Sequence, residues 1–438
     1  AVYEFNSSIE GHEGRSSVSN SGQIARHALI SALQKHIEGL TERLDALNNP
    51  LLADRGTVYA ELDFFFTCAN SICDEEPTGI STVPGVFQAT LGAISTGKNL
   101  IGKLAGNDTT GQHRDWSLAF VGWGNSGLTP EGLARTFFGI LDQAAVGRSN
   151  LDIPSTPSGD RITRVYFTAQ GHDIRHLLTT FLLGAIAFSQ GADDYLDDDM
   201  EGKGLNVSNG EAIEGKSYTR LEHNWDEGFG YFGAARDYLS YSDEEIAGDG
   251  GRADWQGYHD SDGDGAIDLR SEYNFGHSVI AAERDSNSAA EDMTGQAFTA
   301  FYEGRKLIAD NVGAQLTNAQ MLELKGYRDV AVLAWEKSIA ATVIHEINDT
   351  IMHMEADEYD FYAHATSWSK MKGHALAFQF NPRTPLSADD FAAIHAAMGT
   401  APEIPGVGNL DAYKAGLLGA RTVLQNAYGF AEADVADW

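Results

Sequence analysis

The sequence of 438 residues contains little cysteine, proline or positive charge, and each shortage excludes a class of protein. Its two cysteines, Cys68 and Cys73, are too few for a disulfide scaffold, and a zinc site would need further ligands of this kind nearby. Their spacing allows one local disulfide, as in proteins of oxidising compartments, but leaves open whether they pair. Ten prolines and 42% hydrophobic residues indicate a folded globular chain.

Basic residues are outnumbered: 30 lysines and arginines face 63 aspartates and glutamates, a formal net charge of -33. Such a charge repels phosphate backbones, so we expect no nucleic-acid partner, and solubility in a salty medium is its simplest explanation. No run of about 18 apolar residues occurs, so we expect no membrane span. The first residues, AVYEFNSSIEG, lack the regions of a signal peptide, which fits either a cytoplasmic chain or a mature form of an exported one.

Several catalytic signatures are also missing. The sequence has no P-loop, no GxSxG motif and no dinucleotide fingerprint after a strand. His345 and Glu346 begin an HExxH motif that does not continue. No established catalytic motif is therefore present.

Helical periodicity dominates what the sequence does contain. Residues 21–44 repeat apolar positions at steps of three and four, as do 386–398 and 409–428. Thr129 followed by Pro130 is typical of a helix start.

Two capping boxes predict further helix starts, one at Ser242 with Glu245 and one at Thr317 with Gln320. The second helix should run to about residue 354. Only 57–67 and 161–170 are candidate strands, and both are short.

The sharpest local signal is DSDGDGAIDLRSE, which has aspartates at positions one, three and five of a calcium-binding loop and a glycine at the turn at position six. It departs from an EF-hand at position twelve, where Ser271 replaces the bidentate glutamate, so Asp268 or Glu272 must complete the shell. We expect a structural calcium site, and the alternative is a solvated acidic turn. The predicted calcium ligands are Asp260, Asp262, Asp264, Ala266 through its carbonyl oxygen, Asp268 and Glu272.

A second signal is HNWDEGFGYFG, residues 223–233. If this stretch is helical, His223 and Glu227 lie on one face, with Asp226 on a neighbouring line. Imidazole and carboxylate at this spacing can bind iron or zinc if another helix brings further ligands, but they can equally form a buried hydrogen-bonded pair. The candidates for further ligands are His172, His176, His345, Asp349, His353, His364 and His374.

Two acidic, glycine-rich excursions, 191–217 and 247–272, flank this stretch and divide the helical pattern into two halves. We therefore expect an all-α fold with little or no strand. The expected organisation has three parts: an N-terminal helical bundle (1–215), a central motif helix with the calcium-type loop (216–290) and a C-terminal helical bundle (291–438).

Three segments, in order, resemble a branch of the imelysin-like proteins of the bacterial cell envelope: GHDIRHLLTTFLLGAIAFSQGADDYL, LEHNWDEGFGYFG and SWSKMKGHALAFQFNP. The stretch SGQIARHALI is similar to the opening helix of that family. The family motif is GxHxxE, and its nearest counterpart here is His223 with Asp226, or with Glu227 one place later. Leu221 stands where the motif has glycine, which weakens any transfer of peptidase activity.

The resemblance implies two bundle-like halves with internal pseudo-symmetry, a location in the periplasm or at the outer membrane as a lipoprotein, and a role in iron uptake. The expected function is binding of a metal or metal-bearing small ligand near His223. The expected cofactors are a structural calcium ion in the loop that begins at Asp260 and, as a further candidate, iron or zinc. The expected partners are outer-membrane uptake components. The alternatives are a metal-dependent peptidase using His223 and Glu227, and a non-catalytic scaffold protein. A peptidase would need at least three protein ligands and an open water position.

Overall fold

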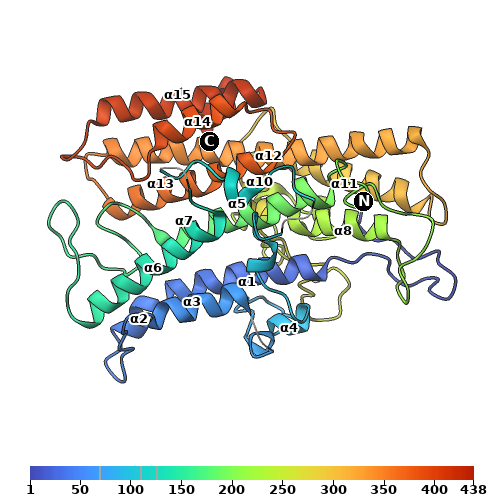
Figure 1. The fold of residues 1–438 in the computed structure, drawn as a ribbon, viewed down its shortest axis with the longest axis horizontal. Coiled ribbons are helices and arrows are strands. Elements are labelled where there is room, and N and C mark those ends of the chain that lie inside the picture. Colours follow the sequence, from blue (N-terminus) through green and yellow to red (C-terminus); the bar gives the residue numbers. More distant parts are fainter. Residues whose placement is uncertain (69–70, 109–110, 125–126) are drawn as a thin grey trace.

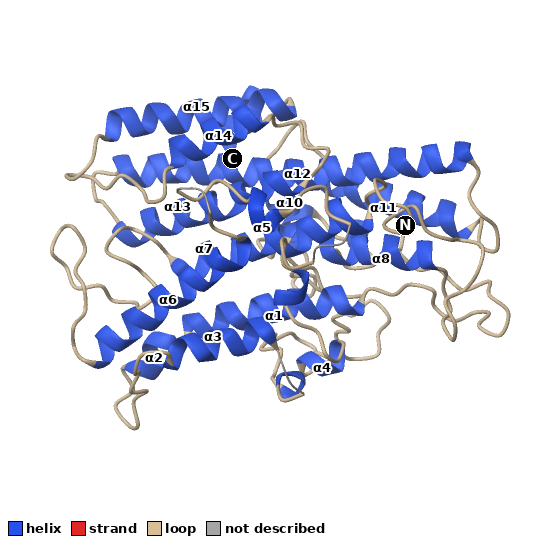
Figure 2. Cartoon of the chain, in the orientation of Figure 1, coloured by secondary structure: helices blue, strands red, loops and turns tan. Residues whose placement is uncertain are grey.

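The computed structural model describes residues 1–68, 71–108, 111–124 and 127–438, and throughout these ranges the regular structure is helical (Figures 1 and 2). Within them no strand forms, and extended pairing is limited to isolated bridges such as that between Val86 and Ile267. The expected all-α fold class is therefore confirmed.

The longer and shorter α-helices follow one another in this order: α1 (Ser21–Glu38), α2 (Leu40–Leu44), α3 (Thr57–Thr67), α4 (Leu91–Ile94), α5 (Trp116–Ala119), α6 (Pro130–Ser149), α7 (Ile174–Leu182), α8 (Arg220–Phe232), α9 (Asp243–Ala247), α10 (His277–Asp285), α11 (Met293–Ala309), α12 (Asn318–Glu355), α13 (Phe361–Ala375), α14 (Ala388–Met398), α15 (Leu410–Tyr428) and α16 (Glu432–Asp437). The 3₁₀ turns are η1 (Cys73–Glu75), η2 (Ile101–Lys103), η5 (Tyr238–Ser240) and η6 (Leu376–Phe380), and the π-helical segments are η3 (Leu183–Phe188) and η4 (Gly191–Tyr195).

The helix starts predicted from capping residues are confirmed. The Thr129 side chain accepts a hydrogen bond from the Gly132 amide at the start of α6, with Pro130 in the first turn. Complete capping boxes open α9 at Ser242 and α12 at Thr317. These side chains satisfy amides that a helix N-terminus otherwise leaves without partners.

The strand candidate at 57–67 is wrong, because this segment forms α3. Its aromatic run favours a strand locally, but Val58, Leu62 and Phe66 lie four residues apart and are all fully buried on one helical face. The other candidate, 161–170, forms turns and isolated bridges rather than a strand. Tertiary burial decides both segments, not strand propensity.

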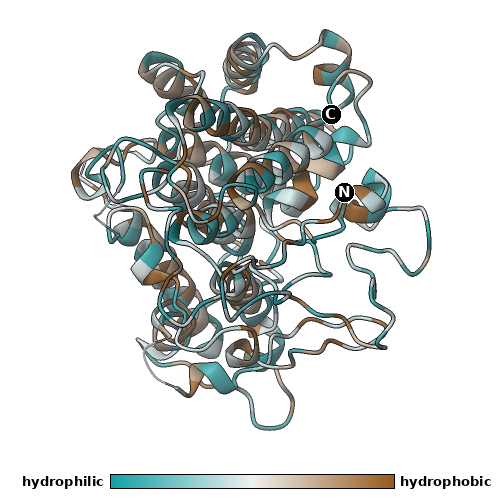
Figure 3. Cartoon of the chain, turned by 90° about the vertical axis from the view of Figure 1, so that its right-hand side faces the viewer, coloured by the Kyte–Doolittle hydropathy of each residue, from teal (hydrophilic) through white to brown (hydrophobic). Residues whose placement is uncertain are grey.

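Helix α12 runs along the length of the molecule, with α11 beside one end and α13 beside the other (Figure 1). Its 38 residues correspond to about 57 Å at 1.5 Å per residue. Helix α7 packs between α13 and α1, while α15 packs against α12 and α14 on the outer side of the molecule. Figure 3 shows these layers nearly end-on, with long loops gathered along one side.

Buried apolar side chains form one continuous core that extends from Tyr3 to Trp438. The division at 1–215, 216–290 and 291–438 stays a prediction, as does internal pseudo-symmetry. Among the described residues, no helix combines the length and apolar character of a membrane span, in agreement with the sequence.

Helix α7 continues into η3 and η4, where the backbone widens to π-helical turns. Such turns occur often at functional sites. Close packing here depends on glycine: a Cβ on Gly184 would lie 2.7 Å from the Ala377 Cβ, and one on Gly191 would lie 2.6 Å from the Trp335 ring. Asp193, in η4, accepts a hydrogen bond from the His113 amide in the loop that precedes α5.

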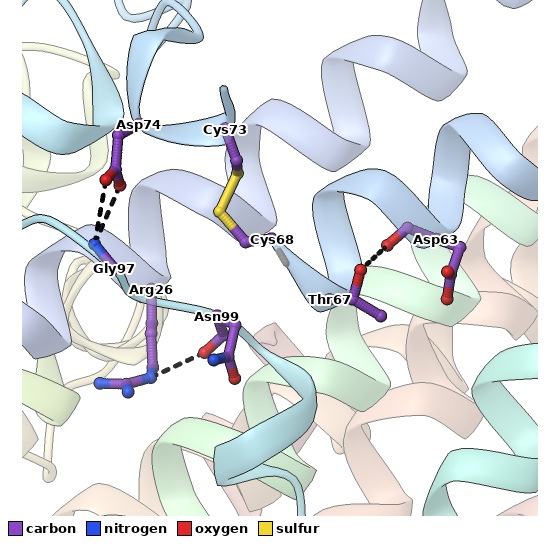
Figure 4. Close-up of a disulfide and its surroundings, with 8 residues drawn as sticks. All are labelled: Arg26, Asp63, Thr67, Cys68, Cys73, Asp74, Gly97 and Asn99. Atoms are coloured by element: carbon purple, nitrogen blue, oxygen red, sulfur yellow. Dashed lines mark hydrogen bonds between the residues drawn. A yellow bond between two sulfur atoms is a disulfide. The ribbon is translucent and has the colours of Figure 1, made fainter. Parts of the chain in front are cut away.

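Cys68 and Cys73 form a disulfide, which answers the question that the sequence left open (Figure 4). Cys73 is fully buried, and the neighbouring Asp74 carboxylate accepts hydrogen bonds from the Gly97 amide at 3.0 and 3.2 Å. The disulfide thereby links the end of α3 to the segment that leads into α4.

Candidate functional site

The HNWDEGFGYFG stretch lies on α8, as predicted. The helix begins with a capping box between Thr219 and Glu222 and ends at Gly233. Gly233 has φ +92°, and a Cβ there would lie 2.4 Å from the Phe275 carbonyl oxygen, so only glycine fits this end of the helix.

Asp226 belongs to a buried ion-pair cluster. Its carboxylate accepts hydrogen bonds from the Tyr3 hydroxyl at 2.9 Å, the Ser19 amide at 3.1 Å and the Arg305 Nε at 2.8 Å. Arg305 is fully buried, and its Nη1 lies 3.0 Å from Glu222. These contacts tie α8 to α11 and to the N-terminal segment, and they use the carboxylate that the sequence offered as a metal ligand.

His223 and Glu227 do lie together, with the His223 Nε2 3.6 Å from the Glu227 Oε1. The His223 Nδ1 is 3.2 Å from the Ser19 carbonyl oxygen, which can only accept, so the proton is on Nδ1. Glu227 accepts a hydrogen bond from the Gln23 amide nitrogen at 2.8 Å. The structure therefore brings two of the three predicted ligands together and turns Asp226 away; a transition-metal site here stays a prediction.

The aspartate loop gathers three predicted calcium ligands. Asp260, Asp262 and Asp264 each place a carboxylate oxygen within 4.8 Å of those of the other two. The Asp260 carboxylate also accepts hydrogen bonds from the Gly263 and Gly265 amides, at 2.8 and 3.0 Å, which curls the loop around it. This is the compact, oxygen-rich geometry that calcium prefers.

The remaining predicted ligands are held within the loop. Glu272 is buried and accepts hydrogen bonds from the Ser261 amide at 2.7 Å and the Asp268 amide at 2.8 Å, so it closes the two ends of the loop together. Asp268 accepts a hydrogen bond from the Gln88 side chain at 2.6 Å. The Ala266 amide donates to Asp264 at 2.9 Å. Calcium binding at this loop stays a prediction.

A cavity of about 420 Å³ between α1, α7, α10, α12 and α13 is lined by two of the predicted histidines, His176 and His374. Burial lowers the pKa of His176 and of His374 to about 3, and burial raises the pKa of Glu346 to about 7. The Lys370 ammonium lies 3.5 Å from Glu346. The cavity therefore places a lysine ammonium beside this carboxylate.

Of the remaining predicted ligands, two lie together and three lie apart. His345 and Asp349 form a group with Glu346 whose ligand atoms lie within 4.8 Å of one another. The His172 Nε2 lies 2.8 Å from the Thr400 carbonyl oxygen, and the His364 Nδ1 hydrogen-bonds a tyrosine hydroxyl. His353 is partly exposed near the end of α12.

A pocket of about 930 Å³ lies between α14, the end of α13 with η6, and the loop around α5. One side is apolar, formed by Val121, Phe378, Leu386 and Phe391. Gly122, with φ +98°, lets the loop approach this wall, because a Cβ there would lie 2.9 Å from Leu376.

The polar side of this pocket is lined by basic side chains. Its wall contains Arg114, Lys372, His113 and His395 but no aspartate or glutamate among the described residues, in a chain with 63 of them. The His113 Nδ1 lies 2.8 Å from the Asp193 carboxylate, which is fully buried behind it. The described lining side chains therefore include basic groups and no acidic ones, unlike the surface of a chain with net charge -33.

Lys372 is 1% exposed at the base of the pocket. Its Nζ lies 2.9 Å from the His395 Nδ1 and 5.9 Å from the Trp123 ring centroid. Burial lowers the pKa of Lys372 to about 7, and burial holds the pKa of His395 well below its ordinary value. The sequence reading did not single out Lys372, His395 or Arg114.

The comparisons with known proteins leave the function open. A family model described as a domain of unknown function (DUF4856) matches residues 155–325, less than half of the chain. The matched region includes α8 and the aspartate loop, whereas α13 and α14 lie beyond it. No curated protein and no solved structure matches the chain.

Proposed function

We propose that this chain is an imelysin-like ligand-binding protein of the bacterial cell envelope. Its ligand is a small, partly apolar molecule that carries negative charge, either free or as a metal complex. The observation that carries this proposal is the pocket of about 930 Å³, which has an apolar wall, the guanidinium of Arg114, the amine of Lys372 and no carboxylate among the lining residues that the structure describes. Ligand sites typically combine apolar walls with a few polar groups in this way.

Envelope location is supported by two features. The disulfide between Cys68 and Cys73 suits an oxidising compartment such as the periplasm. The order of the segments around α7, α8 and α13 resembles the imelysin-like branch, whose members are exported or tethered to the outer membrane. On this proposal, outer-membrane uptake components are the partners.

A metal-bearing ligand fits the same pocket, because organic complexes of ferric iron commonly use anionic oxygen donors. Bacterial iron uptake is therefore the proposed context. Calcium in the loop at Asp260, Asp262 and Asp264 is proposed as a structural ion, since it would pin this loop against the segment that contains Gln88.

The pocket supports ligand binding better than the α8 motif supports metal binding or peptidase chemistry. His223 and Glu227 supply two ligands, whereas a catalytic zinc needs three and an open water position. Arg305 and Tyr3 hold Asp226 away from that pair. We therefore propose that the α8 motif has a structural role.

The test uses 8-anilinonaphthalene-1-sulfonate, a fluorescent anionic aromatic compound, as the probe and 4-bromobenzoate as its competitor. Binding should be saturable and should be lost in Ala396→Trp, which fills the pocket from α14. Ala393→Trp is the matched control, because Ala393 is exposed on the same helix and is not part of the pocket wall.

Charge is tested with Arg114→Gln, which should weaken competition by 4-bromobenzoate about threefold, the effect of an exposed charge pair. Arg55→Gln, at an exposed arginine away from the pocket, should leave it unchanged. Equal binding by Ala396→Trp and the unmodified protein would contradict the proposal and favour the scaffold alternative.

A further inference from the structure

Lys372 has an unusual environment for a lysine. It lies on the buried face of α13, one residue after Met371, and its side chain is almost completely inaccessible to water. Buried lysines normally pair with a carboxylate, because an isolated buried ammonium is costly. In the part of the chain that the structure describes, Lys372 instead contacts an imidazole nitrogen and the face of a tryptophan ring.

The hydrogen bonds of His395 define which group donates to which. The His395 Nε2 lies 3.2 Å from the Ala375 carbonyl oxygen, which can only accept, so the ring proton is on Nε2. The His395 Nδ1 is then an acceptor, and the Lys372 Nζ donates to it at 2.9 Å. A neutral amine that donates one hydrogen in this way keeps its lone pair for another partner.

The surrounding groups favour the neutral amine. The other titratable or charged side chains of the pocket wall are His395 on α14 and His113 and Arg114 in the loop before α5, and none of these is a carboxylate. Burial accordingly brings the pKa of Lys372 down to about 7, so a large fraction of the amine is unprotonated at neutral pH.

Lys370, two residues earlier on α13, is a natural comparison. Its ammonium lies 3.5 Å from Glu346 and its side chain is 36% exposed, so it has both a counter-ion and water. The two lysines differ in environment rather than in sequence neighbourhood.

We propose that Lys372 is a nucleophilic amine that forms an imine with an aldehyde or ketone group of the ligand bound in this pocket. The inference rests on the proposed ligand-binding function and names the chemical class of the ligand. With Arg114 at the rim to hold a carboxylate and Lys372 at the base, the best-suited ligand is an aldehyde acid or an oxo acid.

The reaction balances without any oxidant or reductant. The Nζ lone pair forms a bond to the carbonyl carbon, and the carbon–oxygen π electrons move to oxygen. The His395 Nδ1 can take one Nζ proton and return it to that oxygen. The nitrogen lone pair then forms the carbon–nitrogen double bond as the carbon–oxygen bond breaks, and the second Nζ proton passes to the departing hydroxyl, which leaves as water.

The experiment incubates the full chain with 4-formylbenzoate and sodium cyanoborohydride at pH 7.5 and locates the reduced adduct by peptide mass spectrometry. Lys372 should be labelled about tenfold faster than Lys370, because a pKa of about 7 leaves most of the Lys372 amine unprotonated at pH 7.5. Labelling should be lost in both Lys372→Met and Lys372→Arg. Circular dichroism and a cooperative thermal unfolding transition of Lys372→Met establish that the variant is folded.

The pH profile adds a readout that a structural role would not change. The labelling rate at Lys372 should rise through about pH 7, whereas surface lysines should respond only at higher pH. Even labelling of Lys372 and exposed lysines would overturn the inference.

A second ligand separates the two proposals. If 4-(hydroxymethyl)benzoate, which lacks the carbonyl, displaces the fluorescent probe while 4-formylbenzoate gives no adduct at Lys372, the ligand-binding proposal stands and the imine is refuted. If neither compound displaces the probe, ligand binding of this class fails, and the imine fails with it.

Discussion

Replacing Lys372 with methionine should stabilise the protein, although the substitution removes a hydrogen bond from its interior. Methionine has similar length and no charge, so it fills the same space at the base of the pocket without a desolvation penalty. Lys372 is 1% exposed and lacks a carboxylate partner among its described contacts. An unpaired buried amine of this kind favours the unfolded chain, in which it can bind a proton.

The magnitude follows from the pKa. Burial lowers the pKa of Lys372 from 10.5 to about 7, so between these values the unfolded chain holds a proton that the folded chain does not. This linkage costs the folded state about 4 kcal/mol at pH 7 and about 2 kcal/mol at pH 9, and it vanishes above pH 10.5. Loss of the hydrogen bond to His395 costs about 1 kcal/mol, which leaves a net gain of about 3 kcal/mol at pH 7.

Urea unfolding of both proteins at pH 7 and pH 9 measures this difference. The advantage of Lys372→Met should be large at pH 7 and smaller by about 2 kcal/mol at pH 9, a trend that a packing effect alone would not produce. Lys414→Met, at a surface lysine paired with Glu355, should change the free energy of unfolding by less than about 1 kcal/mol. A destabilised Lys372→Met, or an advantage independent of pH, would refute the reasoning.

Three further predictions concern the rest of the fold. Asp226→Asn should lower the free energy of unfolding by about 3 kcal/mol because it breaks a buried ion pair with Arg305, whereas His223→Ala, on the partly exposed side of α8, should cost about 1 kcal/mol or less; similar losses in urea titrations would argue against the structural role of Asp226. Calcium at millimolar concentration should raise the melting temperature of the unmodified chain but not that of Asp262→Ala, and elemental analysis before and after chelation should find the bound ion; an unchanged melting temperature would rule out the calcium loop. Burial lowers the pKa of His374 to about 3, so its contribution to stability is complete above about pH 6.5 and is lost as the pH falls. Between pH 7 and pH 4, the free energy of unfolding should therefore fall by about 3 kcal/mol less in His374→Phe than in the unmodified protein. Parallel acid-unfolding curves of the two proteins would contradict this.

Local signals in the sequence were sufficient for the helices but not for every segment. Capping residues identified the starts of α6, α9 and α12, because a cap acts within four residues of the amide that it satisfies. The α3 segment is a strand candidate in the sequence because its aromatic run has strand propensity, but it forms a helix. Its burial against α1 and α6 comes from contacts that no local pattern contains.

The same distinction applies to the candidate sites. The aspartate loop is a contiguous motif, so its three carboxylates could be placed from spacing alone. Asp226 could not, because the residue that binds it, Arg305, is 79 positions further along the chain. The sequence indicates only that Lys372 shares a helical face with Trp368 and Ala375. The groups that Lys372 contacts come from α14 and from a loop distant in the sequence, so no local pattern predicts them.

The central claim is that a small anionic ligand binds in the pocket between α14 and the loop around α5. A crystal structure with 4-bromobenzoate tests it most directly, because the anomalous signal of bromine locates the compound without prior assumption. The account predicts one strong bromine peak inside the pocket, with the carboxylate directed toward Arg114 or Lys372. A peak only elsewhere on the protein, or none at a concentration that displaces the fluorescent probe, would contradict it.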